Sequence, residues 1–116
     1  MISVVIDEGT IHRMAGNQSV MREQALHMVT LAAQPNISLQ VIPLKAGIHS
    51  SGGFSFTILS FSDPADPRVV YAELLTTDHN IERPAEVGQY QAAFDQLRGL
   101  ALEPGESTAL ITDRYI

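Results

Sequence analysis

The sequence predicts an α+β fold: a mostly antiparallel sheet of four to five strands, two longer helices and a short C-terminal helix. Three observations lead to this prediction. Short runs rich in β-branched and aromatic residues, bounded by glycine or proline, lie together in the middle of the chain. One long helical pattern precedes these runs, and two helical patterns follow them. Strands that are grouped between helices, rather than alternating with them, are typical of the α+β class.

A β-hairpin is expected at the centre of the sheet. Residues 52–61 and 69–75 have the composition of strands and are bounded by Gly or Pro. The loop between them, residues 62–68, contains two Asp-Pro steps, which neither continue a strand nor begin a helix. The simplest arrangement of two strands joined in this way is antiparallel.

Three elements are expected before the hairpin. Residues 3–7 form a first strand with apolar side chains on both faces, which Glu8 and Gly9 end. Residues 18–33 form a helix that stops before Pro35, and residues 37–43 form the next strand. The connection through this helix suggests a parallel crossover between the two strands.

The remaining elements follow the hairpin. Residues 76–80 make a turn, and residues 81–82 form a short return strand. Pro84 opens a second long helix, since proline is favoured at the first helical position, and residues 103–107 begin a short last helix. The expected core residues come from several of these elements: Leu31, Ile58, Val70, Leu74, Phe94 and Leu97.

Length and composition indicate one domain, residues 1–116, with enough apolar residues (45%) to fold without cross-links. The chain has no cysteine, which excludes disulfides, cysteine-ligated metals and a thiol nucleophile. No metal or cofactor is expected. The first residues lack the pattern of a signal peptide, and no apolar run is long enough to span a membrane, so we expect a cytoplasmic protein.

The charge argues against direct contact with nucleic acid. Seven basic and thirteen acidic residues give a net charge of −6. Proteins that hold a phosphate backbone usually present a patch of Lys and Arg, and seven scattered cations cannot form a large one. No recognition helix is visible either.

One polar residue is unexpected in the first helix. On a helical wheel Gln24 falls within the apolar arc, close to Met28, whereas Glu23 and His27 lie on the polar side, four residues apart. We expect the helix to be packed over more than half of its circumference. A buried amide needs a hydrogen-bond partner, which is either backbone or a ligand.

Tyr71 and Glu73 are the strongest candidates for chemistry. They lie two residues apart in a predicted strand, so their side chains point to the same side of the sheet. A carboxylate among apolar neighbours is either paired with a cation, here Arg13 or Arg22, or faces a ligand. If the protein is an enzyme, Glu73 is the candidate general acid or base and Tyr71 a second catalytic group.

The histidines give weaker signals. His49 and His79 are expected in loops, and a metal site would require them to meet a carboxylate, so none is predicted. The His49 loop could close over a mainly apolar pocket between helix and sheet. The ligand-binding candidates on this interpretation are Gln24, Met28, His49, Tyr71 and Glu73.

Several segments together resemble one known family. The segments are Val5–Glu8, Ile11–Arg13, Gly16, Met21–Gln24, Leu31, Pro35–Pro43, Ala46–His49, Gly53–Phe54, Ile58–Leu59, Val69–Glu73, Tyr90, Phe94–Arg98, Ala101–Leu102 and Glu106–Ile111. They resemble the domain of unknown function that follows an XRE-type helix-turn-helix in actinobacterial, antitoxin-like transcriptional regulators. The resemblance covers nearly the whole chain.

The resemblance implies a regulatory module that binds a protein partner or a small-molecule ligand, coupled to a DNA-binding domain elsewhere. Such regulators are often encoded beside a small partner protein. The helix-turn-helix and the helices that lead into the first strand are missing here, so DNA binding is not carried over to any residue. Apolar surface left by their absence predicts a homodimer. The alternative is a stand-alone protein turned to small-molecule binding or to an enzymatic step in a biosynthetic pathway.

Overall fold

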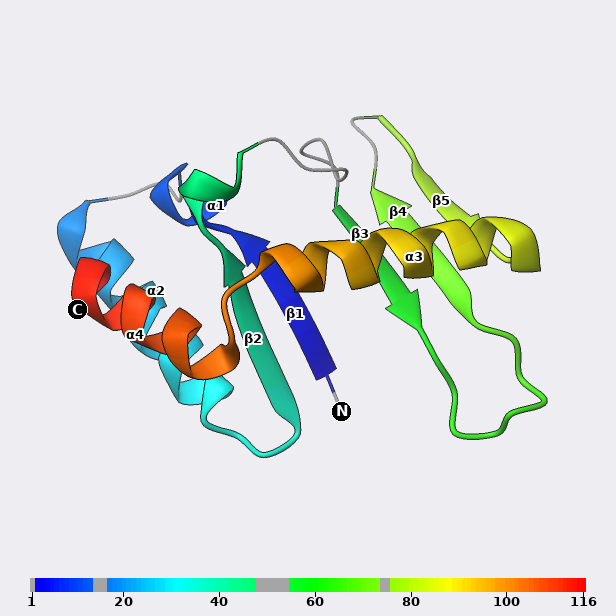
Figure 1. Cartoon of the computed structure of the whole chain (residues 1–116), viewed down its shortest axis with the longest axis horizontal. Coiled ribbons are helices and arrows are strands. Elements are labelled where there is room, and N and C mark those ends of the chain that lie inside the picture. Colours follow the sequence, from blue (N-terminus) through cyan, green and yellow to red (C-terminus); the bar gives the residue numbers. More distant parts are fainter. Residues whose placement is uncertain (1, 14–16, 48–54, 74–75) are drawn as a thin grey trace. The chain divides into compact units, whose positions relative to one another are not determined.

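The computed structural model describes residues 2–13, 17–47, 55–73 and 76–116 (Figure 1). No helix within these ranges combines the length and the apolar composition needed to cross a membrane. The elements follow one another as β1 (Ile2–Asp7), α1 (Glu8–Arg13), α2 (Gln18–Ala32), β2 (Ile37–Ile42), the 3-10 helix η1 (Leu44–Ala46), β3 (Ser55–Leu59), β4 (Val69–Glu73), β5 (Asp78–Ile81), α3 (Pro84–Leu100) and α4 (Pro104–Tyr115).

The chain divides into two compact units. The first unit comprises Met1–Gly47 and Arg98–Ile116, and the second unit comprises Ile48–Leu97. The boundary falls within α3, whose last turn belongs to the first unit. That the whole chain forms one domain stays a prediction.

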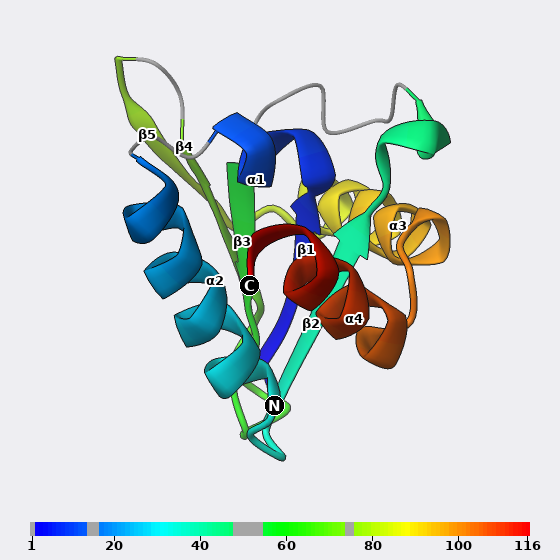
Figure 2. The ribbon, with the colours of Figure 1, turned by 90° about the vertical axis from the view of Figure 1, so that its left-hand side faces the viewer.

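The first unit is a β-α-β crossover with an added helix. Strands β1 and β2 pair in parallel, from Ile2 opposite Ile37 to Asp7 opposite Ile42, which confirms the predicted parallel crossover. Figure 2 shows α2 and α4 lying on the same face of this pair of strands. Parallel strands require a long crossover connection, usually a helix, because a tight turn cannot join them.

The core of the first unit lies between these two helices and the strands. Apolar side chains of α1, α2, β2 and α4 pack together there, and partly buried neighbours surround them. Only one side of α2 is buried, because the residues that it contributes to this cluster recur at the spacing of one helical face. The buried members are Ile11, Ala25, Met28, Leu39, Val41 and Ile111.

The outer edge of β2 is closed by the segment that joins α3 to α4. The Leu102 N–H donates to the Val41 carbonyl (2.8 Å), and the Val41 N–H donates to the Ser107 hydroxyl oxygen (2.9 Å). Gln40 Nε2 and the Ser107 hydroxyl both donate to the Leu102 carbonyl, at 3.1 and 3.2 Å. Ser107 is fully buried, so its hydroxyl replaces a neighbouring strand for the Val41 N–H.

Helix α1 was not predicted, since Glu8 and Gly9 were expected only to end the first strand. Asp7 Oδ1 accepts a hydrogen bond from the Gly9 N–H (2.6 Å), as a helix-capping side chain does. A Cβ atom at position 9 would lie only 2.9 Å from that oxygen. A larger residue would therefore require the Asp7 side chain to shift, and the helix begins directly after the strand.

The second unit is an antiparallel sheet with one covered face. Its strand order is β3-β4-β5, and the pairing of Ser55–Leu59 with Val69–Glu73 confirms the predicted hairpin. Helix α3 covers the face that carries Phe56, whose ring meets Tyr90 edge to face at a centroid distance of 5.2 Å. On this covered face Val70 and Ala72 are buried.

Three predicted details of the elements need correction. The described strands form two sheets, one parallel and one antiparallel, instead of one mostly antiparallel sheet. The short strand is Asp78–Ile81, so most of the predicted turn 76–80 belongs to it. The last helix is twelve residues long. Strand pairing depends on contacts between distant residues, which local composition does not encode.

The predicted core is partly right. Val70 and Leu97 are buried, at 0% and 5% exposure, while Ile58 and Phe94 are half-buried. Leu31 is 41% exposed, so its assignment to the core is wrong. Leu74 lies outside the described residues.

Candidate functional site

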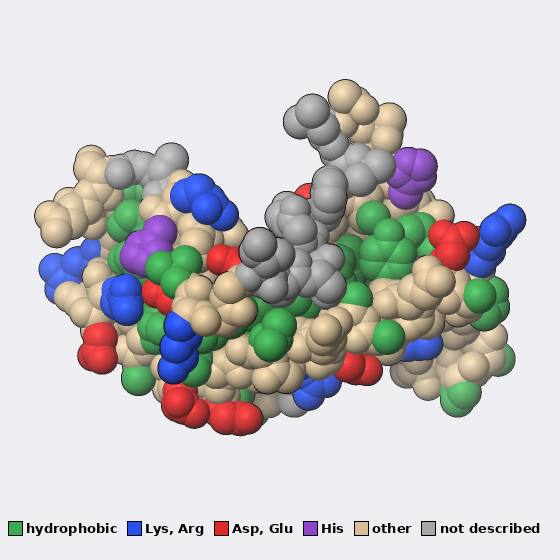
Figure 3. All heavy atoms as spheres, turned by 45° about the horizontal axis from the view of Figure 1, so that its top comes forward, with side chains coloured by type: hydrophobic (Ala, Val, Ile, Leu, Met, Phe, Trp, Pro, Cys, Tyr) green, Lys and Arg blue, Asp and Glu red, His purple; other side chains and the backbone are tan. Residues whose placement is uncertain are grey.

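Charged side chains are dispersed on one face of the molecule. On the face drawn in Figure 3, Lys and Arg side chains stand among acidic and uncharged ones and form no single basic patch. Among the residues that the structure describes, no three His, Asp or Glu side chains come together in a way that could hold a metal ion.

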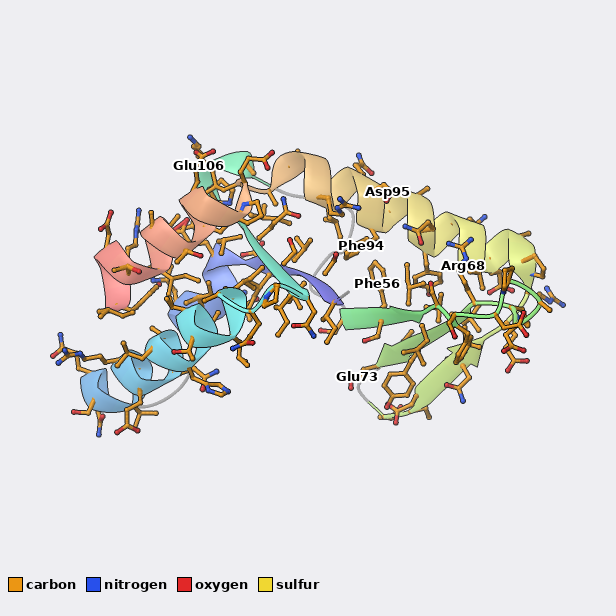
Figure 4. All side chains as sticks on the ribbon, turned by 90° about the horizontal axis from the view of Figure 1, so that it is seen from below. Phe56, Arg68, Glu73, Phe94, Asp95 and Glu106 are labelled. Carbon is orange, nitrogen blue, oxygen red and sulfur yellow. The ribbon has the colours of Figure 1, made fainter. Side chains whose placement is uncertain are left out.

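The face of the three-stranded sheet that is turned away from α3 is the main candidate surface. Figure 4 shows Phe56 pointing from the sheet toward α3, whereas Glu73 points away from the helix. Strand register places the side chains of this face in three rows, since directly paired residues share a face. We call it the open sheet face; its rows are Ser55–Glu73–Asp78, Thr57–Tyr71–Asn80 and Leu59–Val69.

Tyr71 occupies the centre of the open sheet face and is half-exposed. A hydrogen bond with the Asp78 carboxylate is the main reason why the pKa of the Tyr71 hydroxyl is raised, with smaller contributions from desolvation and from the charges of Asp78 and Glu73. The hydroxyl therefore remains a proton donor through neutral pH. It can donate a hydrogen bond but is not activated as a base.

Glu73 and Asp78 are a cross-strand pair of like charge. They are directly paired in the register of β4 and β5, and both are exposed. Carboxylates placed opposite each other in a sheet repel, which disfavours the pair unless a cation or water compensates. The predicted partners of Glu73, Arg13 and Arg22, belong to the first unit. That ion pair stays a prediction.

The other predicted site residues have different surroundings. Gln24 is exposed on α2, so the expectation of a buried glutamine in the core is wrong. Met28, at 8% exposure, is part of the core of the first unit. His79 lies in β5 rather than in a loop, opposite Ala72 and hence on the other face from Tyr71. His49 lies outside the described residues.

The helix α2 is less covered than predicted. Its inward side holds Ala25 and Met28, whereas Val20, Leu26 and Leu31 are 41–48% exposed. Glu23 and His27 are exposed, as expected for the polar side. The wheel identified the polar side correctly but overestimated the buried arc, because an apolar side chain is not buried merely by being apolar.

A second cluster, which we call the Glu8 cluster, joins α1, η1 and the end of α4. Glu8 is 2% exposed, and its Oε1 accepts a hydrogen bond from the Leu44 N–H (3.0 Å). Its Oε2 lies 3.3 Å from Arg114 Nη1 and 3.5 Å from His12 Nε2, but receives no hydrogen bond from the described residues. Arg114 and His12 are themselves half-exposed. A buried carboxylate is thus balanced by groups that reach water.

His12 extends the Glu8 cluster to the C-terminal helix. The Tyr115 hydroxyl lies 2.9 Å from His12 Nδ1, and the two rings meet edge to face. With the hydroxyl as donor, the imidazole proton is on Nε2 and faces Glu8. Burial and the negative charge of Glu8 raise the pKa of Tyr115, against the opposing effect of Arg114. The hydroxyl is therefore not activated as a nucleophile, and the contacts tie α4 to α1.

Sequence reasoning missed the Glu8 cluster. The spacing of Glu8 and His12, four residues apart, was a usable signal once α1 is known to be a helix. The contact between His12 and Tyr115 spans 103 residues, and no local pattern predicts it.

Comparison with known proteins adds the family. The comparisons with curated proteins and with solved structures each give no match. One family model matches residues 1–113, which is nearly the whole chain. The chain therefore belongs to the family described as Domain of unknown function (DUF5753).

Proposed function

We propose that this chain is the effector-binding domain of an XRE-type transcriptional regulator, whose activity it controls by binding a protein partner. The observation that carries the proposal is the open sheet face, which presents Tyr71 between two carboxylates and an exposed apolar row. The association with a helix-turn-helix rests on the resemblance described above. DNA contact is left to that other domain.

The composition of the open sheet face supports a binding role. The solvated face of an antiparallel sheet commonly carries polar side chains. Here Leu59 is 47% exposed and is paired with half-buried Val69, next to Tyr71. Tyrosine is enriched in protein interfaces because its ring gives contact area and its hydroxyl gives a hydrogen bond. A surface of this kind is suited to a protein segment.

The test uses the small proteins encoded beside the gene. Each is titrated against the purified chain by isothermal calorimetry, and we expect one to bind with a Kd of about 10 µM or lower. Tyr71→Ala should weaken this binding at least about tenfold, because the Tyr71 side chain lies at the centre of the open sheet face. Tyr90→Phe, on the covered side, is the matched control and should leave the affinity unchanged. Absence of binding by every neighbour-encoded protein would contradict the proposal.

The alternative function is small-molecule binding or catalysis, for which Tyr71 is a suitable hydrogen-bond donor since its hydroxyl stays protonated. Tyr71→Phe and Glu73→Gln separate the two functions. Loss of ligand binding or turnover at unchanged melting temperature favours the alternative. Unchanged small-molecule behaviour together with loss of the protein partner favours the regulatory domain.

A further inference from the structure

We infer that the open sheet face recognises an extended protein segment that carries a basic side chain and, four residues away, an apolar side chain. The inference rests on the proposed function and names the chemistry of the partner. Its basis is the order of the three rows, which runs from acidic through polar to apolar along β4.

The row that contains Glu73 and Asp78 favours binding of a cation. Glu73 and Asp78 are directly paired, exposed and of like charge. A Lys ammonium or Arg guanidinium placed between them would interact with both carboxylates and remove their repulsion. Because the Tyr71 hydroxyl donates a hydrogen bond to the Asp78 carboxylate, this carboxylate is held toward the centre of the face. The net charge of −6 also favours approach of a basic segment.

The apolar row sets the second anchor. Leu59 and Val69 are paired at the other end of the same face, four residues along β4 from Glu73. At 3.3 Å per residue in a strand, the two rows are roughly 13 Å apart. An extended segment that lies along β4 has the same rise, so its basic and apolar side chains must be four residues apart.

A second copy of this chain fits the face poorly. If two open sheet faces stacked with their β4 strands in the same direction, Glu73 and Asp78 of one molecule would meet those of the other. Like charges across an interface disfavour association. With opposite directions, the carboxylates would be buried against Leu59 and Val69 without a cation, which is also unfavourable. The homodimer expected from the sequence would therefore use another surface.

The test measures amide chemical shifts of the ¹⁵N-labelled chain at low salt. The probe is a heptapeptide of threonine with Lys at its second and Leu at its sixth position. One control peptide has Glu in place of Lys, and another has Leu moved to the fourth position. We expect the Lys peptide to shift the amides of Thr57, Tyr71 and Asn80, with a Kd at least about tenfold lower than that of the Glu peptide. The peptide with the altered spacing should bind about threefold more weakly than the probe.

Variants of the chain test the same contact from the other side. Glu73→Gln combined with Asp78→Asn should raise the Kd for the Lys peptide about fivefold or more. Asp66→Asn removes an exposed charge from a loop of the same unit and should leave the Kd unchanged. The inference is overturned if the Lys peptide shifts no amide of β3, β4 or β5 up to about 5 mM, or if the Glu peptide binds equally well. It is also overturned if the acidic variants bind like wild type.

The two proposals fail in different ways. A neighbour-encoded protein could bind with an affinity that Glu73→Gln and Asp78→Asn do not change. In that case the regulatory function is supported and the inference on the open sheet face is wrong. If the Lys peptide binds as expected but no neighbour-encoded protein does, the face stands and the regulatory assignment is wrong.

Discussion

Glu8 is the one charged residue that is buried among the residues that the structure describes. Its carboxylate is buried, while its partners Arg114 and His12 reach water. Removal of one member of a buried ion pair is costly when it leaves an uncompensated charge inside the protein. The cost of a substitution in the Glu8 cluster therefore depends on which member is removed.

We predict that Arg114→Gln destabilises the protein more than Glu8→Gln does, by about 1 kcal/mol or more. The first change leaves the buried carboxylate with the Leu44 N–H and His12, and removes the guanidinium charge beside it. The second leaves only a half-exposed guanidinium, and the glutamine oxygen can still accept the Leu44 N–H. Urea denaturation of both variants measures the difference in free energy of unfolding.

The control for this pair is Arg83→Gln. Arg83 and Glu86 form an ion pair 3.6 Å long with both side chains substantially exposed, and such pairs contribute about 0–1 kcal/mol. Equal destabilisation by Arg114→Gln and Glu8→Gln would contradict the assigned burial of the carboxylate.

Tyr115 should make stability sensitive to alkaline pH. Its pKa is raised in the folded protein, so the folded state holds the hydroxyl proton more tightly than the unfolded chain. The resulting stabilisation is complete below the ordinary tyrosine pKa of about 10 and is lost as the pH rises from there through the folded value. Tyr115→Phe should flatten this part of the stability curve. Parallel curves for wild type and variant between pH 9 and about 11.5 would exclude the effect.

At the scale of elements, local chemistry predicted most helices and strands. Pro84 opens α3 as expected, and β2 occupies the predicted residues. Helix α1 was missed because glycine disfavours helices, whereas here the Gly9 N–H is capped by Asp7 Oδ1 at the start of the helix. The alternation of Tyr71 and Glu73 predicted that they share one side of the sheet, since strand periodicity is a local property. It did not predict that this side is the open sheet face, turned away from α3. The pairing of Glu73 with Asp78 required the register of β5.

Helix α2 offers a direct test of its buried side. Met28 is 8% exposed and Leu31 is 41% exposed. Met28→Ala should cost about 2–5 kcal/mol, because it leaves a cavity in the core of the first unit. Leu31→Ala should cost about 0.5–1 kcal/mol. Thermal unfolding followed by circular dichroism ranks the two, and a reversed order would place the wrong side of α2 inward.

At the scale of the whole molecule, the charge predicts the absence of one activity. The sequence has seven basic and thirteen acidic residues, and the basic ones are dispersed on the face shown in Figure 3. We predict that the chain alone shows no sequence-selective DNA binding, since neutralisation of several phosphates is required for it. Fluorescence anisotropy with the upstream region of its own gene measures this at low and physiological salt. A rise in anisotropy that depends on the DNA sequence and decreases with salt would contradict the prediction.

The division into two units could not be predicted from the sequence. Composition indicates no linker, and the boundary lies inside a continuous helix, α3. The sequence of a continuous helix does not show where along it the contacts change from one unit to the other. Only contacts between distant residues, such as those of Leu102 with β2, determine the boundary.

The connection between α3 and α4 has a consequence for which changes the chain tolerates. Loops normally accept insertions, because they run over the surface with few fixed contacts. Here the segment from Leu102 to Ser107 has a fixed length, because Leu102 and Ser107 are both hydrogen-bonded to the backbone of Val41. One inserted residue would displace either the Leu102 amide or the Ser107 hydroxyl from its bond. The length of this connection is therefore constrained, although connections usually tolerate changes of length.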